Sequence, residues 1–465
     1  MMVTRLLRCA HLLCAVWAMA TARAAAPAPE VPVHRHTLAN GLQVLVKADR
    51  RAPVAVSMIW YRVGSADEGN GQTGISHVLE HMMFKGTSTL APGEFSRRIA
   101  RAGGRDNAFT SRDYTVYHQR LPKEQLPLAL SLEADRMANL RMSEEEFARE
   151  MRVVMEERRQ RVEDSPHALL FEQLLATALL VNPERQPIIG WMHDLENLRL
   201  SDTQRWYDSW YAPNNATLVV AGDVDPDAVF DLAERHFGAL APRTLPQRKA
   251  RHEPVQRGIR RIAVKASAEL GQVVLAYRVP VLRDLDGGQE PYALWMLSEI
   301  LDGHDAARLP RALVREAQIA NQVSASYDGL GRASGLFVVS ATLAPGRSPQ
   351  EFEAAWRAQL RQVIEAGISQ AEMKRVKAQA VASQIYQQDS VFAQASQIGR
   401  FNALGLPLDA ATRLIRKLET VSPEQVREAA RRYLLDDVLT VAVLEPQPID
   451  QPRAQTLPEP TDEHR

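Results

Sequence analysis

The chain has 465 residues, of which 45% are apolar and 24% are charged, and its 56 basic residues balance its 56 acidic ones. This composition excludes a wholly disordered chain and gives no support to a polycation that binds nucleic acid. The length predicts two or three domains.

The first 24 residues have the pattern of a secretory signal peptide. Arg5 and Arg8 form a basic start, and an apolar run follows from Ala10 to Ala20. Ala22-Arg23-Ala24 fits a cleavage site, and cleavage after Ala26 fits as well. Because the apolar run is too short to span a bilayer, we expect the segment to be removed on export.

Both cysteines, Cys9 and Cys14, lie inside this segment. No small residue precedes either of them, so we expect no lipid anchor and therefore no membrane anchor. The processed chain would contain no cysteine, which excludes disulfides, thiol catalysis and thiolate metal ligands. The sequence thus predicts an exported periplasmic protein, with secretion as the alternative.

The rest of the chain divides near its middle. Residues 243–257 are basic, polar and proline-containing, which is typical of a linker. Residues 447–465 hold several prolines and acidic residues, and we expect them to form a disordered tail. These segments leave an N-terminal domain over residues 31–242 and a C-terminal domain over residues 258–446.

The two domains resemble distant copies of each other. Each interleaves strands and helices, which predicts mixed α/β domains, and a repeat of this length indicates a duplicated domain rather than a solenoid. The corresponding pairs are strands 54–60 and 272–277, helices 77–86 and 294–303, helices that begin at Ser143 and Ser369, and strands 217–221 and 439–443.

One motif in the first domain carries chemistry, His77-Val-Leu-Glu80-His81. On a helix, residues four apart lie on one face, so both histidines can bind one cation, and the carboxylate of Glu80 reaches the same patch. The order H-x-x-E-H is the inverse of the commoner zinc-peptidase motif. The alternative is that two surface histidines lie near a glutamate by chance.

A catalytic zinc site needs a third protein ligand, and the predicted helix over residues 143–162 offers it. That helix begins with a capping box and has an apolar stripe at helical spacing. Glu150 and Glu157 lie two turns apart at the border of the stripe, where a carboxylate needs a partner. Alternatively, the glutamates form exposed ion pairs with arginines of the same helix. The arginines available are Arg152, Arg158 and Arg161.

The H-x-x-E-H motif, followed 76 residues later by Glu157, resembles the pitrilysin/insulinase family of zinc metallopeptidases, especially its short two-domain branch of processing-peptidase-like members. The resemblance extends from about His36 to Glu445. It implies an α+β fold of two homologous domains, the metallohydrolase fold of mitochondrial processing peptidase. Further matching segments are Asn40-Gly-Leu42, Gly64-Ser65, Met83-Phe-Lys-Gly-Thr87, Gly103-Gly104, Asn107-Ala-Phe-Thr110, Tyr211-Ala-Pro-Asn-Asn215 and Val220-Ala-Gly-Asp223.

The resemblance also implies roles for individual residues. His77, His81 and Glu157 would bind one Zn²⁺ per chain, Glu80 would act as general base, and Glu150 would orient a histidine ligand. Glu156 is the alternative to Glu157, but helix geometry points it about 100° away.

The function implied is that of a zinc endopeptidase that hydrolyses peptides or unfolded segments in a chamber. The segment Asn107-Ala108-Phe109 resembles the edge strand to which family members add the substrate by backbone hydrogen bonds. Its alternative is an ordinary strand end. Two other functions remain open: a non-catalytic structural or chaperone-like subunit, and a zinc hydrolase of another substrate class.

The second domain has lost the metal set. Leu294, Leu297 and Ser298 align with the three motif residues, while Val376 and Ser383 align with Glu150 and Glu157. We therefore expect a metal-free domain that forms a wall of the substrate chamber.

A departure from the family predicts a partner. Active members carry an arginine in the C-terminal half, and seven residues later a tyrosine, that bind the substrate backbone. Here the aligned positions are Val314 and Asn321, and Arg315 lies one residue late. Some bacterial members of this branch divide the two motifs between two subunits. We therefore expect a heterodimer with a homologous subunit that holds the Arg/Tyr pair, or else a homodimer.

Overall fold

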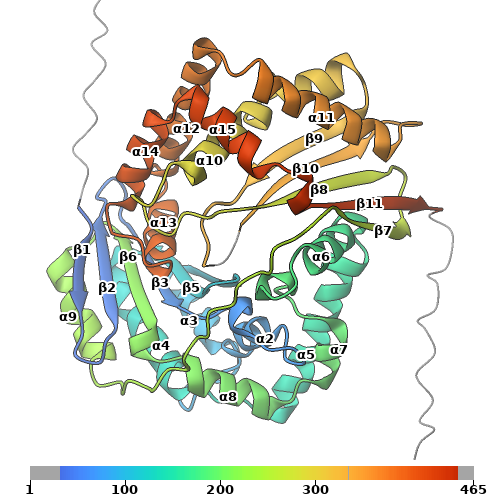
Figure 1. The fold of residues 1–465 in the computed structure, drawn as a ribbon. Coiled ribbons are helices and arrows are strands. Elements are labelled where there is room, and N and C mark those ends of the chain that lie inside the picture. Colours follow the sequence, from blue (N-terminus) through green and yellow to red (C-terminus); the bar gives the residue numbers. More distant parts are fainter. Residues whose placement is uncertain (1–31, 333–334, 449–465) are drawn as a thin grey trace, which may run out of the picture. The chain divides into compact units, whose positions relative to one another are not determined.

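The computed structural model describes residues 32–332 and 335–448 (Figure 1). The predicted signal peptide, residues 1–24, and residues 449–465 of the predicted tail lie outside the described residues. Within the described ranges, no helix has both the length and the apolar composition needed to cross a membrane.

The N-terminal half contains a six-stranded sheet with the order β1-β2-β6-β3-β5-β4. Its central strands β3 and β6 are apolar runs buried over nearly their whole length, as strands covered on both faces are. Strand β4 pairs with β5 at the edge of the sheet. The strands are β1 His34–Thr37, β2 Gln43–Ala48, β3 Val54–Tyr61, β4 Arg105–Thr110, β5 Thr115–Pro122 and β6 Ala216–Gly222.

Several helices of this half share one apolar core with one face of the sheet. Among them are α2 and α5, which carry the residues of the predicted site. After α5 the chain makes a π-helical turn, η4, over Arg159–Glu163. The helices are α2 Ile75–Met82, α3 Glu94–Arg101, α4 Leu126–Asn139, α5 Glu144–Arg158, α6 Pro166–Ala178, α7 Met192–Asn197, α8 Leu200–Trp210 and α9 Pro226–Phe237.

The C-terminal half contains a five-stranded sheet with the order β7-β11-β8-β10-β9. Its parallel pair β7 and β11 corresponds to the parallel pair β2 and β6 of the first sheet. The strands are β7 Arg260–Ser267, β8 Gln272–Val279, β9 Ala320–Tyr327, β10 Gly335–Leu343 and β11 Leu439–Gln447. The helices are α10 Glu290–Asp302, α11 Pro349–Glu365, α12 Gln370–Gln387, α13 Val391–Ala403, α14 Ala410–Thr420 and α15 Pro423–Tyr433.

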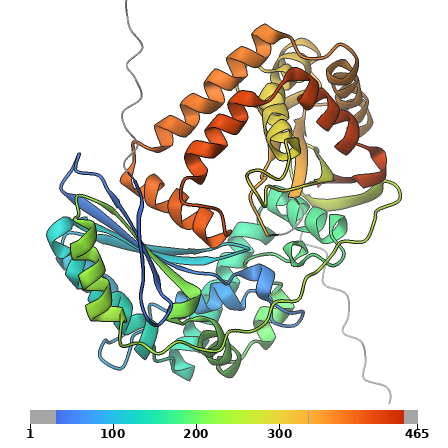
Figure 2. The same ribbon diagram turned by 60° about the vertical axis from the view of Figure 1, so that its left-hand side comes forward.

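Each half contributes one helix to the sheet of the other half (Figures 1 and 2). Helix α6 packs against β7, β8 and β11 through Leu170 and Leu174. Helix α13 packs against β3 and β6, and its Gly399 lies so close to Trp60 that a Cβ atom would be 2.0 Å from the indole ring. Both sheets are thus covered on their second face by a helix from the other half.

The strands and helices that the sequence predicts in corresponding pairs are present, and the prediction of two mixed α/β halves is confirmed. One boundary is wrong, because the helix expected to reach Gly86 ends at Met82. Gly86 itself has a left-handed φ of 104°, which a helix does not accommodate. Residues 241–257 contain no helix or strand, and β11 runs through Gln447, the first residue of the predicted tail.

Candidate metal centre

The two histidines of the H-x-x-E-H motif lie on α2, a short helix whose apolar residues pack into the core. His77 and His81 are four residues apart and therefore share one face of the helix. Their ring centroids lie 4.8 Å apart, and both rings approach Glu157 of α5.

The start of α2 is held by a fully buried carboxylate that the sequence analysis did not single out. Glu68 accepts hydrogen bonds from the backbone N–H groups of Gly74, at 2.7 Å, and Ser76, at 2.9 Å. The first N–H groups of a helix have no partner within the helix, so this carboxylate satisfies two of them. Burial raises the pKa of Glu68 to about 8. Glu68 thus fixes the helix one turn before His77.

Helix α5 begins as predicted at Ser143, whose side chain accepts a hydrogen bond from the backbone N–H of Glu146. Its apolar stripe packs into the same core as α2. Glu150 and Glu157 lie at the border of the stripe and both face α2. Two separate helices therefore bring the predicted site residues together.

The three predicted ligand side chains converge on one point. The Oε2 atom of Glu157 lies 3.7 Å from Nε2 of His77 and 3.4 Å from Nε2 of His81. The ligand atoms of the three residues all lie within 4.8 Å of one another. Catalytic zinc sites use three protein ligands of these types and keep a fourth position for water. This donor set therefore fits one Zn²⁺ ion.

Burial also favours the ligand form of the first histidine. Desolvation, together with the charges of His81 and Arg161, lowers the pKa of His77 to about 3. The ring is therefore neutral at pH 7, which leaves a nitrogen lone pair for a metal. The pKa of His81 moves differently: burial lowers it, but the hydrogen bond with Glu150 and nearby carboxylate charges outweigh burial and raise it.

Glu150 lies beside the second histidine. Its Oε2 is 3.1 Å from Nδ1 of His81, and its Oε1 is 2.6 Å from Nζ of Lys85. Burial raises the pKa of Glu150, but these two hydrogen bonds outweigh burial and lower it. A carboxylate on Nδ1 favours the tautomer in which Nε2 is free for a metal. Lys85 was not predicted, although it lies four residues after His81 on the sequence.

Glu80 points toward the edge strand. The hydroxyl of Thr110, the last residue of β4, donates a hydrogen bond of 2.5 Å to Oε2 of Glu80. Burial raises the pKa of Glu80 above its usual value, against the effect of this hydrogen bond. Thr110 was not predicted as a site residue, although it closes the Asn107-Ala-Phe-Thr110 segment that matches the family.

The side chains of His77, Glu80, His81, Thr110 and Glu157 line a pocket of about 630 Å³. Strand β4 forms one wall with Asn107, Ala108 and Phe109, the residues predicted to bind substrate. The remaining walls are mainly apolar and come chiefly from η4, α6 and the loop that contains Ile188 and Ile189. Among their residues are Val162, Ala168, Phe171, Leu175, Ile188 and Ile189. The three candidate metal ligands and an exposed strand edge therefore share one pocket.

Glu156 lies away from the histidines. Its side chain is 55% exposed and lies 3.2 Å from the guanidinium of Arg159. This exposed ion pair is of the kind expected as the alternative, but its arginine is not one of the three predicted partners. Glu157 does pair with a predicted partner, since its Oε1 lies 2.6 Å from Nη1 of Arg161.

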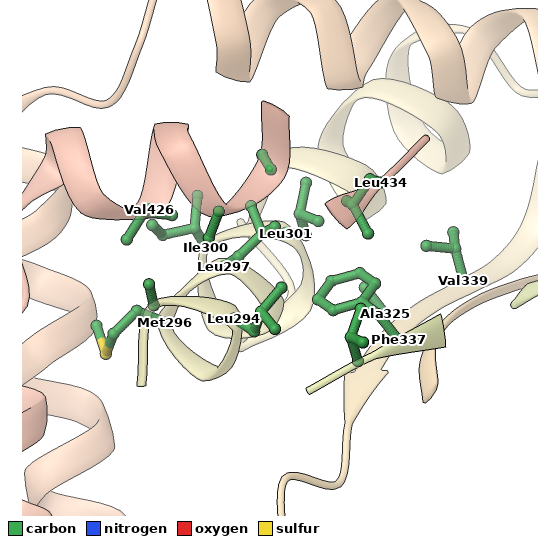
Figure 3. Close-up of a cluster of buried hydrophobic side chains, with 14 of the residues drawn as sticks. Leu294, Met296, Leu297, Ile300, Leu301, Ala325, Phe337, Val339, Val426 and Leu434 are labelled. Carbon is green, nitrogen blue, oxygen red and sulfur yellow. The ribbon is translucent and has the colours of Figure 1, made fainter. Parts of the chain in front are cut away.

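The C-terminal half shows no such arrangement among its described residues. Leu294 and Leu297 of α10, which align with His77 and Glu80, are fully buried in the hydrophobic core of this half, which also contains Phe337 (Figure 3). In residues 32–332 and 335–448, the grouping of side chains suited to a metal is the one at His77.

A helix with the H-x-x-E-H motif and a glutamate from a second helix form the kind of site that one class of zinc peptidases has. Residues 43–191 match the sequence model of "Insulinase (Peptidase family M16)", and residues 197–380 match that of the "Peptidase M16 inactive domain". The zinc protease PqqE of Helicobacter pylori is 34% identical over 353 residues, which cover 75% of this chain and 78% of the relative. The chain therefore belongs to the insulinase family, peptidase family M16.

Other relatives agree with this assignment. An uncharacterized zinc protease of Mycobacterium tuberculosis (strain H37Rv) is 29% identical over 426 residues, 90% of this chain and 94% of the relative. A crystal structure of a protease from Helicobacter pylori superposes with a TM-score of 0.84 at 30% identity, covering 89% of this chain and 100% of that chain.

The first half of the periplasmic protease PqqL from Escherichia coli has a TM-score of 0.75 at 18% identity, covering 89% of this chain and 92% of that chain. At that identity the likeness shows the shared fold. The predictions of the family and of two homologous domains are confirmed, the second domain being of the type called inactive.

Proposed function

We propose that this protein is a zinc-dependent endopeptidase in which His77, His81 and Glu157 hold one Zn²⁺ ion. The observation that carries the proposal is the convergence of these three side chains, with ligand atoms within 4.8 Å of one another, at the wall of a pocket. The zinc proteases among the relatives support the choice of metal.

Glu80 is proposed as the general base. Bound zinc would polarise the scissile carbonyl and lower the pKa of a water molecule. The carboxylate of Glu80 is positioned by Thr110 and has a raised pKa, which suits a group that takes a proton and returns it to the leaving amine.

The substrate is proposed to be a peptide in extended conformation. Strand β4 lies at the edge of its sheet and lines the pocket, so a peptide can add to it as a further strand through backbone hydrogen bonds. The backbone N–H of Ala108 at present donates to Oδ1 of Asn107, at 2.8 Å. A bound peptide carbonyl would take the place of that side-chain oxygen.

The test is zinc content by elemental analysis together with peptide hydrolysis before and after a chelator. We expect one zinc per chain, loss of hydrolysis with the chelator and recovery with added Zn²⁺. His81→Ala should lose both metal and activity. Full zinc occupancy without hydrolysis of any peptide library would favour the non-catalytic alternative.

We further propose that the protein works with a homologous subunit that supplies the Arg/Tyr pair. Val314 packs partly buried against the C-terminal core, while Arg315 and Asn321 are exposed. Because residue 321 is an asparagine, no tyrosine occupies the family's position. Co-expression with the product of an adjacent homologous gene should raise peptidase activity. Unchanged activity and a homodimer by light scattering would contradict the proposal.

Export to the periplasm is proposed from the signal-peptide pattern of residues 1–24. N-terminal sequencing of protein from the periplasmic fraction should give a start after Ala24 or Ala26. Recovery of the chain in the cytoplasm with its first residues intact would contradict this.

A further inference from the structure

Arg158 follows the proposed ligand Glu157 in sequence, yet its side chain points into the protein. It is 5% exposed, and the side chain of its partner Glu172 is 6% exposed. Nη1 of Arg158 lies 2.8 Å from Oε2 of Glu172, and Nη2 lies 3.1 Å from Oε1. Two parallel hydrogen bonds of this kind give an arginine–carboxylate pair both strength and a defined geometry.

This ion pair joins two helices. Arg158 ends α5, whereas Glu172 lies in the middle of α6. Leu170 and Leu174 of α6 pack against the C-terminal sheet in a cluster that includes Val274. The helix that carries Glu157 is therefore tied to a helix that rests on the other half of the molecule.

The same guanidinium also contacts the segment that packs against the start of α2. Nη1 of Arg158 donates a hydrogen bond of 2.8 Å to the backbone oxygen of Gly190. Gly190 in turn lies against Gly74, the residue that precedes α2, and a Cβ atom on Gly190 would be 2.8 Å from Cα of Gly74. Both glycines have left-handed φ, 89° and 85°, so neither position accepts a larger residue without strain.

We propose that Arg158 is a positioning residue of the metal centre, which holds the helix of Glu157, the start of the histidine helix and α6 in one fixed arrangement. The inference rests on the proposed function of the site. Through α6 and Glu172, the C-terminal half, which carries no ligand set among its described residues, takes part in fixing the ligand geometry of the N-terminal half.

The test compares Arg158→Lys with Arg149→Lys in the full chain. A lysine cannot reproduce the planar, bidentate contact with Glu172 while also donating to Gly190. We expect Zn²⁺ affinity, measured by competition with a chelating dye, to fall about 10–100-fold in Arg158→Lys. The absorption bands of the Co²⁺-loaded chain should also change, and kcat should fall while KM stays near the wild-type value.

Arg149→Lys is the matched control, because Arg149 forms exposed ion pairs with Glu145 and Glu146 on the same helix. It should leave Zn²⁺ affinity and the Co²⁺ spectrum unchanged. Equal losses in both variants would indicate a general effect on α5 and would overturn the proposed role of Arg158.

Glu172→Gln keeps the shape of the pair but removes its charge, with Glu145→Gln as its control. Glu172→Gln should weaken Zn²⁺ binding, but by less than Arg158→Lys does. If circular dichroism shows that Arg158→Lys does not fold, Glu172→Gln tests the role of the ion pair in its place. Wild-type Zn²⁺ affinity and Co²⁺ spectrum in the folded variants would overturn this inference alone. A wild-type chain that binds no Zn²⁺ would overturn the proposed function itself.

Discussion

Helices α2 and α10 occupy corresponding places in the two halves but have opposite environments. In α2, His77 and Glu80 line a pocket, whereas the aligned Leu294 and Leu297 of α10 lie fully buried in a hydrophobic core (Figure 3). Because the two halves share the fold, the backbone alone does not decide which half has the candidate metal site. The difference lies in a few side chains on one face of α2 and in the pocket that they line.

Helix α5, which carries the candidate ligand Glu157, contrasts in the same way with its counterpart α12. Helices α5 and α12 both begin with a capping serine, Ser143 and Ser369, that accepts a hydrogen bond from a backbone N–H three residues later. Yet Glu157 lies beside two histidines, while the aligned Ser383 is exposed. The duplicated scaffold thus preserves caps and apolar stripes where the candidate ligands have been replaced.

Substitution at the aligned positions Glu80 and Leu297 should separate chemistry from stability. Glu80→Gln should lower kcat about 10²–10⁴-fold, because the general base is removed, with zinc still bound and the melting temperature unchanged. Leu297→Ala should leave zinc bound but cost about 2–5 kcal/mol of unfolding free energy, because it opens a cavity in the core. Peptide hydrolysis measures kcat, elemental analysis measures bound zinc, and denaturant unfolding measures the unfolding free energy of both variants. Wild-type hydrolysis by Glu80→Gln would refute its role as base.

The adjacent glutamates of α5 sharpen the comparison within one helix. Glu157→Gln should lose Zn²⁺ at micromolar chelator concentrations that leave the wild type loaded, because a neutral amide is a poor zinc ligand. Glu156→Gln is the matched control, since Glu156 is exposed and pairs with Arg159. Chelator titration followed by elemental analysis reads out the difference. A metal-free Glu156→Gln beside a loaded Glu157→Gln would reverse the assignment.

Glu150 should matter less than the ligands. Glu150→Gln should weaken Zn²⁺ affinity about 10–100-fold, because the carboxylate that orients His81 is replaced by an amide. Dye competition measures this, and Glu145→Gln, an exposed substitution on the same helix, should leave the affinity unchanged. An affinity equal to that of the wild type would mean that Glu150 serves Lys85 rather than the histidine.

The exchanged helices predict an effect on stability and none on the candidate metal site. Gly399→Ala should cost about 1–3 kcal/mol, because the new methyl group has to displace the buried ring of Trp60. In an exposed helix the same change would stabilise by about 1 kcal/mol, so the sign of the effect is diagnostic. Thermal unfolding should show one transition, since each sheet is covered by a helix of the other half. Two separate transitions would contradict this coupling.

Local patterns predicted much of the fold and the candidate site. The apolar runs of β3 and β8 and the serine caps of α5 and α12 are signals that neighbouring residues carry by themselves. The H-x-x-E-H spacing needs only one helical turn to place both histidines together.

Other features depend on residues that are distant in sequence. The bond from Thr110 to Glu80 exists because an edge strand passes α2, and Glu68 caps that helix from a preceding turn. Neither contact follows from a spacing along the chain, although Thr110 lies in a segment that matches the family.

The sequence by itself determined the elements, their duplication and the residue types of the candidate ligand set, because periodicity, caps and a five-residue motif act over one or two turns. Only the tertiary structure decided that α6 and α13 exchange between the halves and that Arg158, unlike the exposed Arg161, is buried against Glu172 and Gly190. The physical reason is burial. A guanidinium cannot be placed inside a protein until the carboxylate and carbonyl that satisfy it are brought there from other elements.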